Sequence, residues 1–157
     1  MAVLQSRSHP HAAVMLDAAA RTAQQAADQL GVALGQIAKS IIFRRKSDDV
    51  AVLVVTSGDR RVDERRVAAL VCSADARLGR ADAEFVKAKT GFSIGGVAPV
   101  GHLQASVTLI DRELFRFAEI WAAAGHPHAV FRLTPEQLQV LTDAPVADVV
   151  EELPAAP

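Results

Sequence analysis

The chain has 157 residues, of which 50% are hydrophobic, so it is long enough and apolar enough to bury a core. The formal net charge of −1 and the lack of a recognition-helix pattern argue against a DNA-binding protein. No run of about eighteen consecutive apolar residues exists, which excludes a transmembrane helix, and the single cysteine leaves no internal disulfide. The first residues lack the apolar core of a secretory signal, so we expect a cytoplasmic protein.

The first half of the chain predicts a helix, a β-hairpin and a second helix. Residues 22–31 have Thr22 as the N-cap and Gly31 as the C-cap of a short helix. Residues 37–58 hold two β-branched apolar runs around the turn sequence KSDD, which is typical of a hairpin. Residues 61–74 predict a helix with an acidic first turn. The residues that we expect along one face of this helix are Val62, Arg66, Ala69 and Leu70.

The second half predicts two helices and three strands. Residues 80–91 read as a short helix that ends at a glycine, and residues 105–111 read as a strand. The alanines of residues 119–125 favour a helix, but the segment is short and ends at a glycine. We interpret it as a strand that forms a second hairpin with residues 128–133. Residues 134–142 begin with a capping box and predict a closing helix.

Helices and strands do not alternate regularly, which favours an α+β fold over a doubly wound sheet. We find no internal repeat and no linker, so residues 1–157 are expected to form a single domain. The end of the chain is expected to add a last strand and to fray over residues 150–157.

A stretch rich in glycine, TGFSIGGVAPVG, occupies residues 90–101. Glycine removes the Cβ that would block the close approach of a ligand, and Pro99 stiffens the loop that Gly95 and Gly96 loosen. A loop that is both bent and stiff suits a binding site better than a spacer. It matches neither a P-loop nor a dinucleotide-binding fingerprint.

Lys39 is the residue that fits its surroundings least. On a strand, Ile37, Lys39, Ile41 and Phe43 share one face because side chains alternate. An ammonium buried there without a partner costs several kcal/mol or loses its proton. The side chain therefore either extends to solvent, pairs with an anion of the protein, or lines a pocket for a phosphate or a carboxylate ester.

Other side chains that carry chemistry give weaker signals. Cys72 lies in the apolar stretch AALVCSA and is expected to be a buried structural thiol, not a nucleophile. The histidine pairs around Pro10 and Pro127 have no companion cysteine or carboxylate at metal-ligand spacing. We therefore predict no metal site, and no serine-hydrolase motif is present.

The order of IAKSIIF, a second strand and DAEFVKAKTGFSIGGVAPVGH resembles the YbaK/prolyl-tRNA-synthetase-associated editing domain family over most of the chain. In that family a lysine on a strand faces a G-x-x-x-P loop across the pocket. Here these are Lys39, followed by Ser40, and the loop from Gly95 to Pro99. The resemblance implies an α+β domain whose curved, barrel-like mixed sheet is packed with helices.

The resemblance also implies an activity, namely hydrolysis of the ester of mischarged tRNA. Members act mainly on proline tRNA carrying a small amino acid, and alanine, cysteine, serine and 2-aminobutyrate are all candidates here. Water is the nucleophile, so neither a metal nor a cofactor is expected. The implied catalytic residues are Lys39, Gly95, Gly96 and Val97. The implied substrate-binding residues are Ser40, Ala98, Pro99 and His102.

The implied partners are tRNA and prolyl-tRNA synthetase, and the sequence does not indicate an oligomeric state. The basic residues expected to contact the acceptor stem of the tRNA are Arg44, Arg45, Lys46, Lys87 and Lys89. An alternative is a module with a degenerate editing fold that binds tRNA or a synthetase without hydrolysis. The presence of both Lys39 and the loop favours the enzyme.

Overall fold

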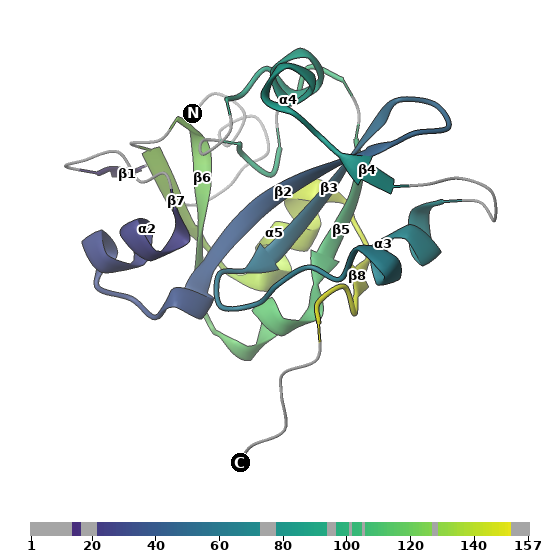
Figure 1. Ribbon diagram of the computed structural model, residues 1–157. Helices are drawn as coiled ribbons and strands as arrows, with labels where there is room; N and C mark the ends of the chain where they lie inside the picture. The colour runs from purple at the N-terminus through teal and green to yellow at the C-terminus, as the bar shows by residue number, and fades with distance from the viewer. Residues whose placement is uncertain are drawn as a thin grey trace.

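Four helices and one mixed sheet make up the described part of the chain (Figure 1). The computed structural model describes residues 14–16, 22–72, 78–93, 97–100, 102–104, 106–126 and 129–151. The helices are α2 (Ala23–Leu30), α3 (Glu64–Val71), α4 (Ala83–Thr90) and α5 (Pro135–Thr142), with 3-10 turns η1 (Leu34–Gln36) and η2 (Arg112–Arg116). The strands are β1 (Val14–Met15), β2 (Ile37–Arg45), β3 (Val50–Ser57), β4 (Leu78–Arg80), β5 (Val107–Asp111), β6 (Ile120–His126), β7 (Ala129–Leu133) and β8 (Val146–Ala147).

The described strands follow the order β1-β7-β6-β2-β3-β5-β8, with β4 also paired to β2. The expected hairpins are confirmed, because β2 pairs antiparallel with β3, and β6 pairs antiparallel with β7. Strand β2 runs parallel to β6, and β3 runs parallel to β5. The sheet is therefore mixed, and the predicted α+β fold class is confirmed.

Local signals in the sequence set the bounds of the helices. The hydroxyl of Thr22 accepts a hydrogen bond from the backbone N–H of Gln25, and Gly31 ends α2 in the left-handed conformation with φ of 69°. Helix α5 begins with the predicted capping box between Thr134 and Gln137. These caps satisfy backbone groups that a helix end leaves without partners, so the bounds follow from a few residues.

Helices cover both faces of the sheet, which places the core in two layers. On β3, Leu53 and Val55 pack in one layer with Leu138 of α5. The alternate residues of β3 pack in the second layer with Val67 of α3 and Val149. Figure 1 shows α3 and α5 on opposite sides of the central strands. Because side chains alternate along β3, this strand contributes residues to both layers, and all six residues from Ala51 to Thr56 are buried.

The structure corrects the buried face of the helix expected at residues 61–74. Val67 is fully buried, whereas Leu70 is 55% exposed and Ala69 is also exposed. Helix α3 spans only two turns, and the side that meets the sheet carries Val67 and Val71. Cys72, which ends α3, is only partly buried, so the expectation of a buried thiol was wrong.

A short strand precedes α4, where the sequence had predicted the start of a helix. Strand β4 pairs antiparallel with the end of β2, and the helix begins three residues later. The carboxylate of Asp82 accepts from the N–H of Phe85 at 2.8 Å and so fixes that start. Near the end of the chain Val150 bridges to Val62, while residues 152–157 lie outside the described part. In the described residues no helix is long and apolar enough to cross a membrane.

Candidate functional site

Lys39 lies on β2, on the sheet face that also carries Ile41 and Phe43, as its spacing predicts. The side chain is half-buried, and within the described residues it makes no direct ion pair. Burial lowers the pKa of Lys39 below its ordinary value, while the carboxylates of Asp59 and Asp111 act in the opposite direction. An ammonium that is partly desolvated but not paired is available to an anionic ligand.

A cavity of about 310 Å³ opens beside Lys39. The residues that line it are Lys39, Ile41, Ile42, Phe43, Arg61, Val62, Glu64 and Arg80. Its apolar part comes from β2 and from Val62, and its charged part comprises three cations and one carboxylate. Such a mixture of apolar walls and a few convergent polar groups is typical of a ligand site, and the volume lies at the small end of the range for such sites.

The edge of β2 next to this cavity is incompletely paired. Strand β6 pairs with β2 only at residues 37–38, and β4 pairs only at residues 43–45. Figure 1 shows β6 diverging from β2 beyond its short pairing. In the described part of the chain, residues 39–42 therefore have no strand partner on this edge. Their backbone groups need hydrogen bonds from another segment, from solvent or from a ligand.

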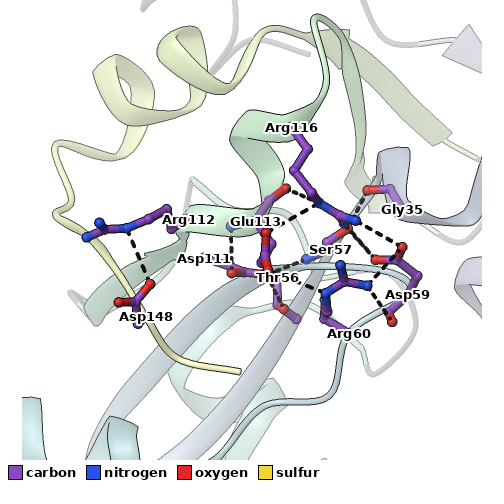
Figure 2. Close-up of polar contacts among 10 residues, drawn as sticks. All are labelled: Gly35, Thr56, Ser57, Asp59, Arg60, Asp111, Arg112, Glu113, Arg116 and Asp148. Carbon is purple, nitrogen blue, oxygen red and sulfur yellow. Dashed lines mark hydrogen bonds and ion pairs between the residues drawn. The ribbon is translucent and has the colours of Figure 1, made fainter. Parts of the chain in front are cut away.

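Two polar residues continue the row that begins at Lys39 across the sheet. Thr56 of β3 is the register partner of Lys39, and Asp111 of β5 lies beside Thr56. The hydroxyl of Thr56 donates to Asp111 Oδ2 at 2.8 Å (Figure 2). Asp111 is fully buried and also accepts from the N–H groups of Ser57 at 3.1 Å and Glu113 at 2.9 Å. Its carboxyl group is thus held by three hydrogen bonds on the same sheet face as the ammonium of Lys39.

A second polar cluster holds the turn that follows β3 (Figure 2). Arg116 Nη2 donates to both Ser57 Oγ and Asp59 Oδ1 at 2.8 Å, and Ser57 Oγ lies 2.5 Å from the carbonyl oxygen of Gly35. Burial alone would raise the pKa of Asp59, but the hydrogen bonds from Arg116 and Ser57 outweigh it and hold that pKa below its usual value. Asp59 therefore stays charged, and its negative charge favours the protonated form of Lys39.

Only part of the predicted loop is described. Gly95 and Gly96 lie outside the described residues, whereas Val97, Ala98 and Pro99 are buried. None of these three is among the residues that line the described cavity. The loop therefore packs into the protein on its proline side, and the predicted roles of its glycines stay predictions.

His102 is tied to the same loop. Its Nε2 lies 2.7 Å from the carbonyl oxygen of Ala98, so Nε2 carries the proton, and its ring meets Phe92 edge-on with centroids 5.6 Å apart. Its Nδ1 is buried and has no hydrogen-bond partner among the described residues. Burial lowers the pKa of His102, although the hydrogen bond to Ala98 opposes this effect. The neutral ring thus helps to fix the end of the loop.

Ser40 does not share the cavity with Lys39. Neighbouring residues of a strand point to opposite faces, and Ala38 and Ile42 pack in the other core layer. Ser40 Oγ is buried there without a hydrogen-bond partner in the described residues. The structure thus separates the two residues that the K-S sequence places side by side.

Two of the predicted tRNA-binding arginines pair with acidic residues of their own hairpin. Arg44 Nε lies 2.6 Å from Asp49 Oδ1, and Arg45 Nη2 lies 2.8 Å from Asp48 Oδ2. Arg45 Nη1 also donates to the carbonyl of Val71 at 2.9 Å. These pairs lie near the surface, so they leave Arg44 more available to a tRNA than Arg45, which also holds the end of α3.

The fold brings the predicted basic residues at the end of β2 close to those of α4. The guanidinium of Arg44 lies 5.6 Å from the ring centroid of Phe85, and Lys89 Nζ lies 5.8 Å from the same centroid. Lys87 donates to a carbonyl at the end of its own helix, and the stem of Lys46 lies against β4. These residues therefore form one basic surface, and its contact with tRNA stays a prediction.

The residues that sequence reasoning missed are those that tertiary contacts bring to Lys39. Arg80 reaches the cavity because it is the register partner of Phe43, and Arg61 and Glu64 reach it at the start of α3. Thr56 and Asp111 join the row through strand pairing. The hairpin register could have indicated Thr56, whereas nothing local indicates Arg80 or Asp111.

These features agree with comparisons to known proteins. Residues 17–141 match the aminoacyl-tRNA editing domain family, so this chain belongs to that family and the resemblance is confirmed. The uncharacterized protein YwhH of Bacillus subtilis is 35% identical over 117 residues, which are 74% of this chain and 72% of that protein.

Two further relatives connect the family to particular reactions. A solved structure of a protein proposed as a trans-editing enzyme for prolyl tRNA synthetase has a TM-score of 0.87 and 40% identity, covering 96% of this chain and 94% of that one. EbsC of Enterococcus faecalis, proposed as a Cys-tRNA(Pro)/Cys-tRNA(Cys) deacylase, is 24% identical over 128 residues, which are 82% of this chain and 76% of that protein.

Proposed function

We propose that this protein is a trans-editing deacylase that hydrolyses the ester of proline tRNA carrying a small amino acid such as alanine, cysteine, serine or 2-aminobutyrate. The observation that carries the proposal is the half-buried ammonium of Lys39 at a small cavity, which forms no ion pair with the described residues, within a domain of the aminoacyl-tRNA editing family. The proposed roles of two relatives, in editing for prolyl-tRNA synthetase and in deacylation, support the choice of tRNA.

In this proposal Lys39 binds the terminal phosphate or the ester oxygen as a positive point charge. Water attacks the carbonyl carbon of the ester, the bond from that carbon to the ribose oxygen breaks, and a proton passes to the ribose. The products are a free amino acid and a tRNA with an intact terminal hydroxyl. As the family resemblance implies, backbone N–H groups of the loop at Gly95, Gly96 and Val97 stabilise the negative charge that develops on the carbonyl oxygen. Val97 does not line the described cavity, so this role requires the ester to extend beyond the cavity towards the loop.

The size of the cavity supports selection of small amino acids. A volume of about 310 Å³ is near the lower limit for ligand pockets, and Ile41 and Phe43 on β2 cannot move without disturbing the core behind them. A larger side chain is then rejected by steric clash. A deacylase of this kind works where aminoacyl-tRNA is used, so the proposal places the protein in the cytoplasm, with prolyl-tRNA synthetase as the partner whose errors it corrects.

The test measures amino acid release from proline tRNA charged in turn with each of the four small amino acids and with proline. Wild type is compared with Lys39→Ala, and Arg132→Gln on β7 serves as the control for the loss of one positive charge away from the cavity. We expect one small mischarged ester to be hydrolysed, proline to be spared, and Lys39→Ala to be slower by about 100-fold or more.

Equal unfolding midpoints for the three proteins would show that the loss in Lys39→Ala is chemical. If wild type binds tRNA but hydrolyses none of the esters, the enzyme proposal fails, and the alternative of a non-catalytic binding module takes its place. If Lys39→Ala keeps the wild-type rate, the role given to Lys39 is wrong.

A further inference from the structure

Two arginines at the cavity have no role in the function proposed so far. Arg61 and Arg80 line the cavity together with Lys39, but both are exposed at its mouth while Lys39 is half-buried within it. The cavity thus presents one ammonium inside and two guanidinium groups outside, against the single carboxylate of Glu64. Its charge is strongly positive although the whole chain carries a formal net charge of −1.

Within the described part of the chain, these two guanidinium groups make few contacts with the protein itself. Among the described residues Arg61 has one ion pair, with Glu151 at 3.7 Å, and its side chain is 86% exposed, so this contact contributes little. Arg80 has no ion pair or hydrogen bond with any described residue. By contrast, Arg116 makes three contacts of 2.7–2.8 Å within its cluster. Arg61 and Arg80 are therefore free to bind a ligand.

The fold fixes where the two arginines stand. Arg80 of β4 is the register partner of Phe43 of β2. It therefore lies opposite a residue that is four positions beyond Lys39 along β2. Arg61 precedes Val62, which bridges to Val150, and its carbonyl accepts from the N–H of Glu151 at 2.8 Å. Both backbones are thus held by pairing, and the two side chains approach the mouth from different elements.

This arrangement matches a chain of phosphates better than a single small anion. A guanidinium fork binds phosphate oxygens in a bidentate manner, and a small carboxylate inside the cavity would need only the ammonium. A ligand that places its reactive end near Lys39 and a backbone with repeated charges outside would engage all three cations. The single-stranded 3′ end of an RNA has this form.

We propose that Arg61 and Arg80 bind the phosphates immediately 5′ of the terminal nucleoside and so guide the single-stranded 3′ end of the tRNA into the cavity. The ligand class is a single-stranded ribonucleotide chain, bound through its backbone and not through its bases. The assignment rests on the proposed function for the identity of the RNA, but it is tested by binding and does not depend on hydrolysis.

The experiment measures the dissociation constant of a short uncharged RNA that ends in CCA between 50 and 200 mM salt. Wild type is compared with Arg61→Gln and Arg80→Gln, and Arg132→Gln is the matched control because it removes an arginine from another part of the sheet. The logarithm of the association constant falls linearly with the logarithm of the salt concentration, and each lost phosphate contact makes this fall less steep by about 0.7 for a single strand. Between 50 and 200 mM salt, the factor by which affinity falls should therefore be roughly three times larger for wild type than for either cavity variant.

Lysine variants distinguish the effect of the positive charge from the effect of the guanidinium shape. Arg61→Lys and Arg80→Lys keep the charge, so they should retain the wild-type salt slope even if affinity falls, because a lysine binds phosphate as a point charge. The proposal is overturned if the glutamine variants keep the wild-type slope, if Arg132→Gln lowers it equally, or if wild type does not bind the RNA. Failure of ester hydrolysis with these slopes intact would refute the proposed function and leave this inference standing.

Discussion

Replacement of Asp111 by alanine should cost far more stability than its position at the end of a strand suggests. Its carboxylate is fully buried and accepts hydrogen bonds from the Thr56 hydroxyl, the Ser57 N–H and the Glu113 N–H. The donors on Thr56 and Ser57 are themselves fully buried and cannot turn to water. Each buried donor left without a partner costs about 1–3 kcal/mol, so we expect Asp111→Ala to lower the free energy of unfolding by about 2–6 kcal/mol.

The assay is equilibrium unfolding in urea, with the slope m compared between variants to confirm that the two-state comparison holds. Asp148→Ala is the matched control, because Asp148 is also an aspartate with a polar partner, Arg112 at 3.3 Å, but both of these side chains are more than 60% exposed. The control should change the free energy of unfolding by less than about 0.5 kcal/mol.

A second variant keeps the test informative if Asp111→Ala fails to fold. Thr56→Val removes the hydroxyl donor without changing the shape of the side chain, and it should cost about 1 kcal/mol. The alanine substitution at Asp111 should then cost less in the Thr56→Val background than in wild type, because one buried donor is already gone. A cost for Asp111→Ala similar to that of Asp148→Ala would refute the reasoning.

Three further results are expected. Because burial lowers the pKa of His102, the unfolded chain binds its proton first, so the free energy of unfolding should be greatest above about pH 6.5 and fall as the pH drops through the lowered pKa. In His102→Gln this fall should be smaller when unfolding is compared at neutral and acidic pH, and an unchanged pH profile would contradict the assignment. Leu53→Ala, at a fully buried position, should cost about 2–5 kcal/mol in the same urea assay, whereas Val140→Ala, at a position 80% exposed, should be nearly neutral. Asp63→Ala removes the cap of α3 and should cost about 1 kcal/mol, with Asp63→Asn close to wild type; equal losses in both would show that the cap is not the cause.

Sequence reasoning located most elements because their signals are local. The cap of Thr22, the left-handed glycine at Gly31 and the capping box at Thr134 each involve residues within a few positions of one another. The two-residue period of β2 likewise placed Lys39 on the face of Ile41 and Phe43 before any neighbour was known. Such features depend on backbone geometry and on hydrogen bonds inside one turn of chain.

The sequence did not reveal which side of α3 would be buried, because the apolar residues of AALV surround a helix of only two turns. The neighbouring strands select Val67 and leave Leu70 in solvent. Strand β4 was missed for a related reason, since three residues have no pattern of their own and become a strand only by pairing with the end of β2.

The sequence by itself therefore determined the family, the α+β class and the lysine around which the site is built. Only the tertiary structure decided which charges surround that lysine. Thr56 and Asp111 are 55 residues apart and meet because β3 and β5 are parallel neighbours. Arg80 reaches the cavity through the register of β4, whereas Ser40 lies on the face of β2 opposite to Lys39 and does not line the cavity. Strand pairing acts between distant segments, and no property of either segment alone specifies its partner or its register.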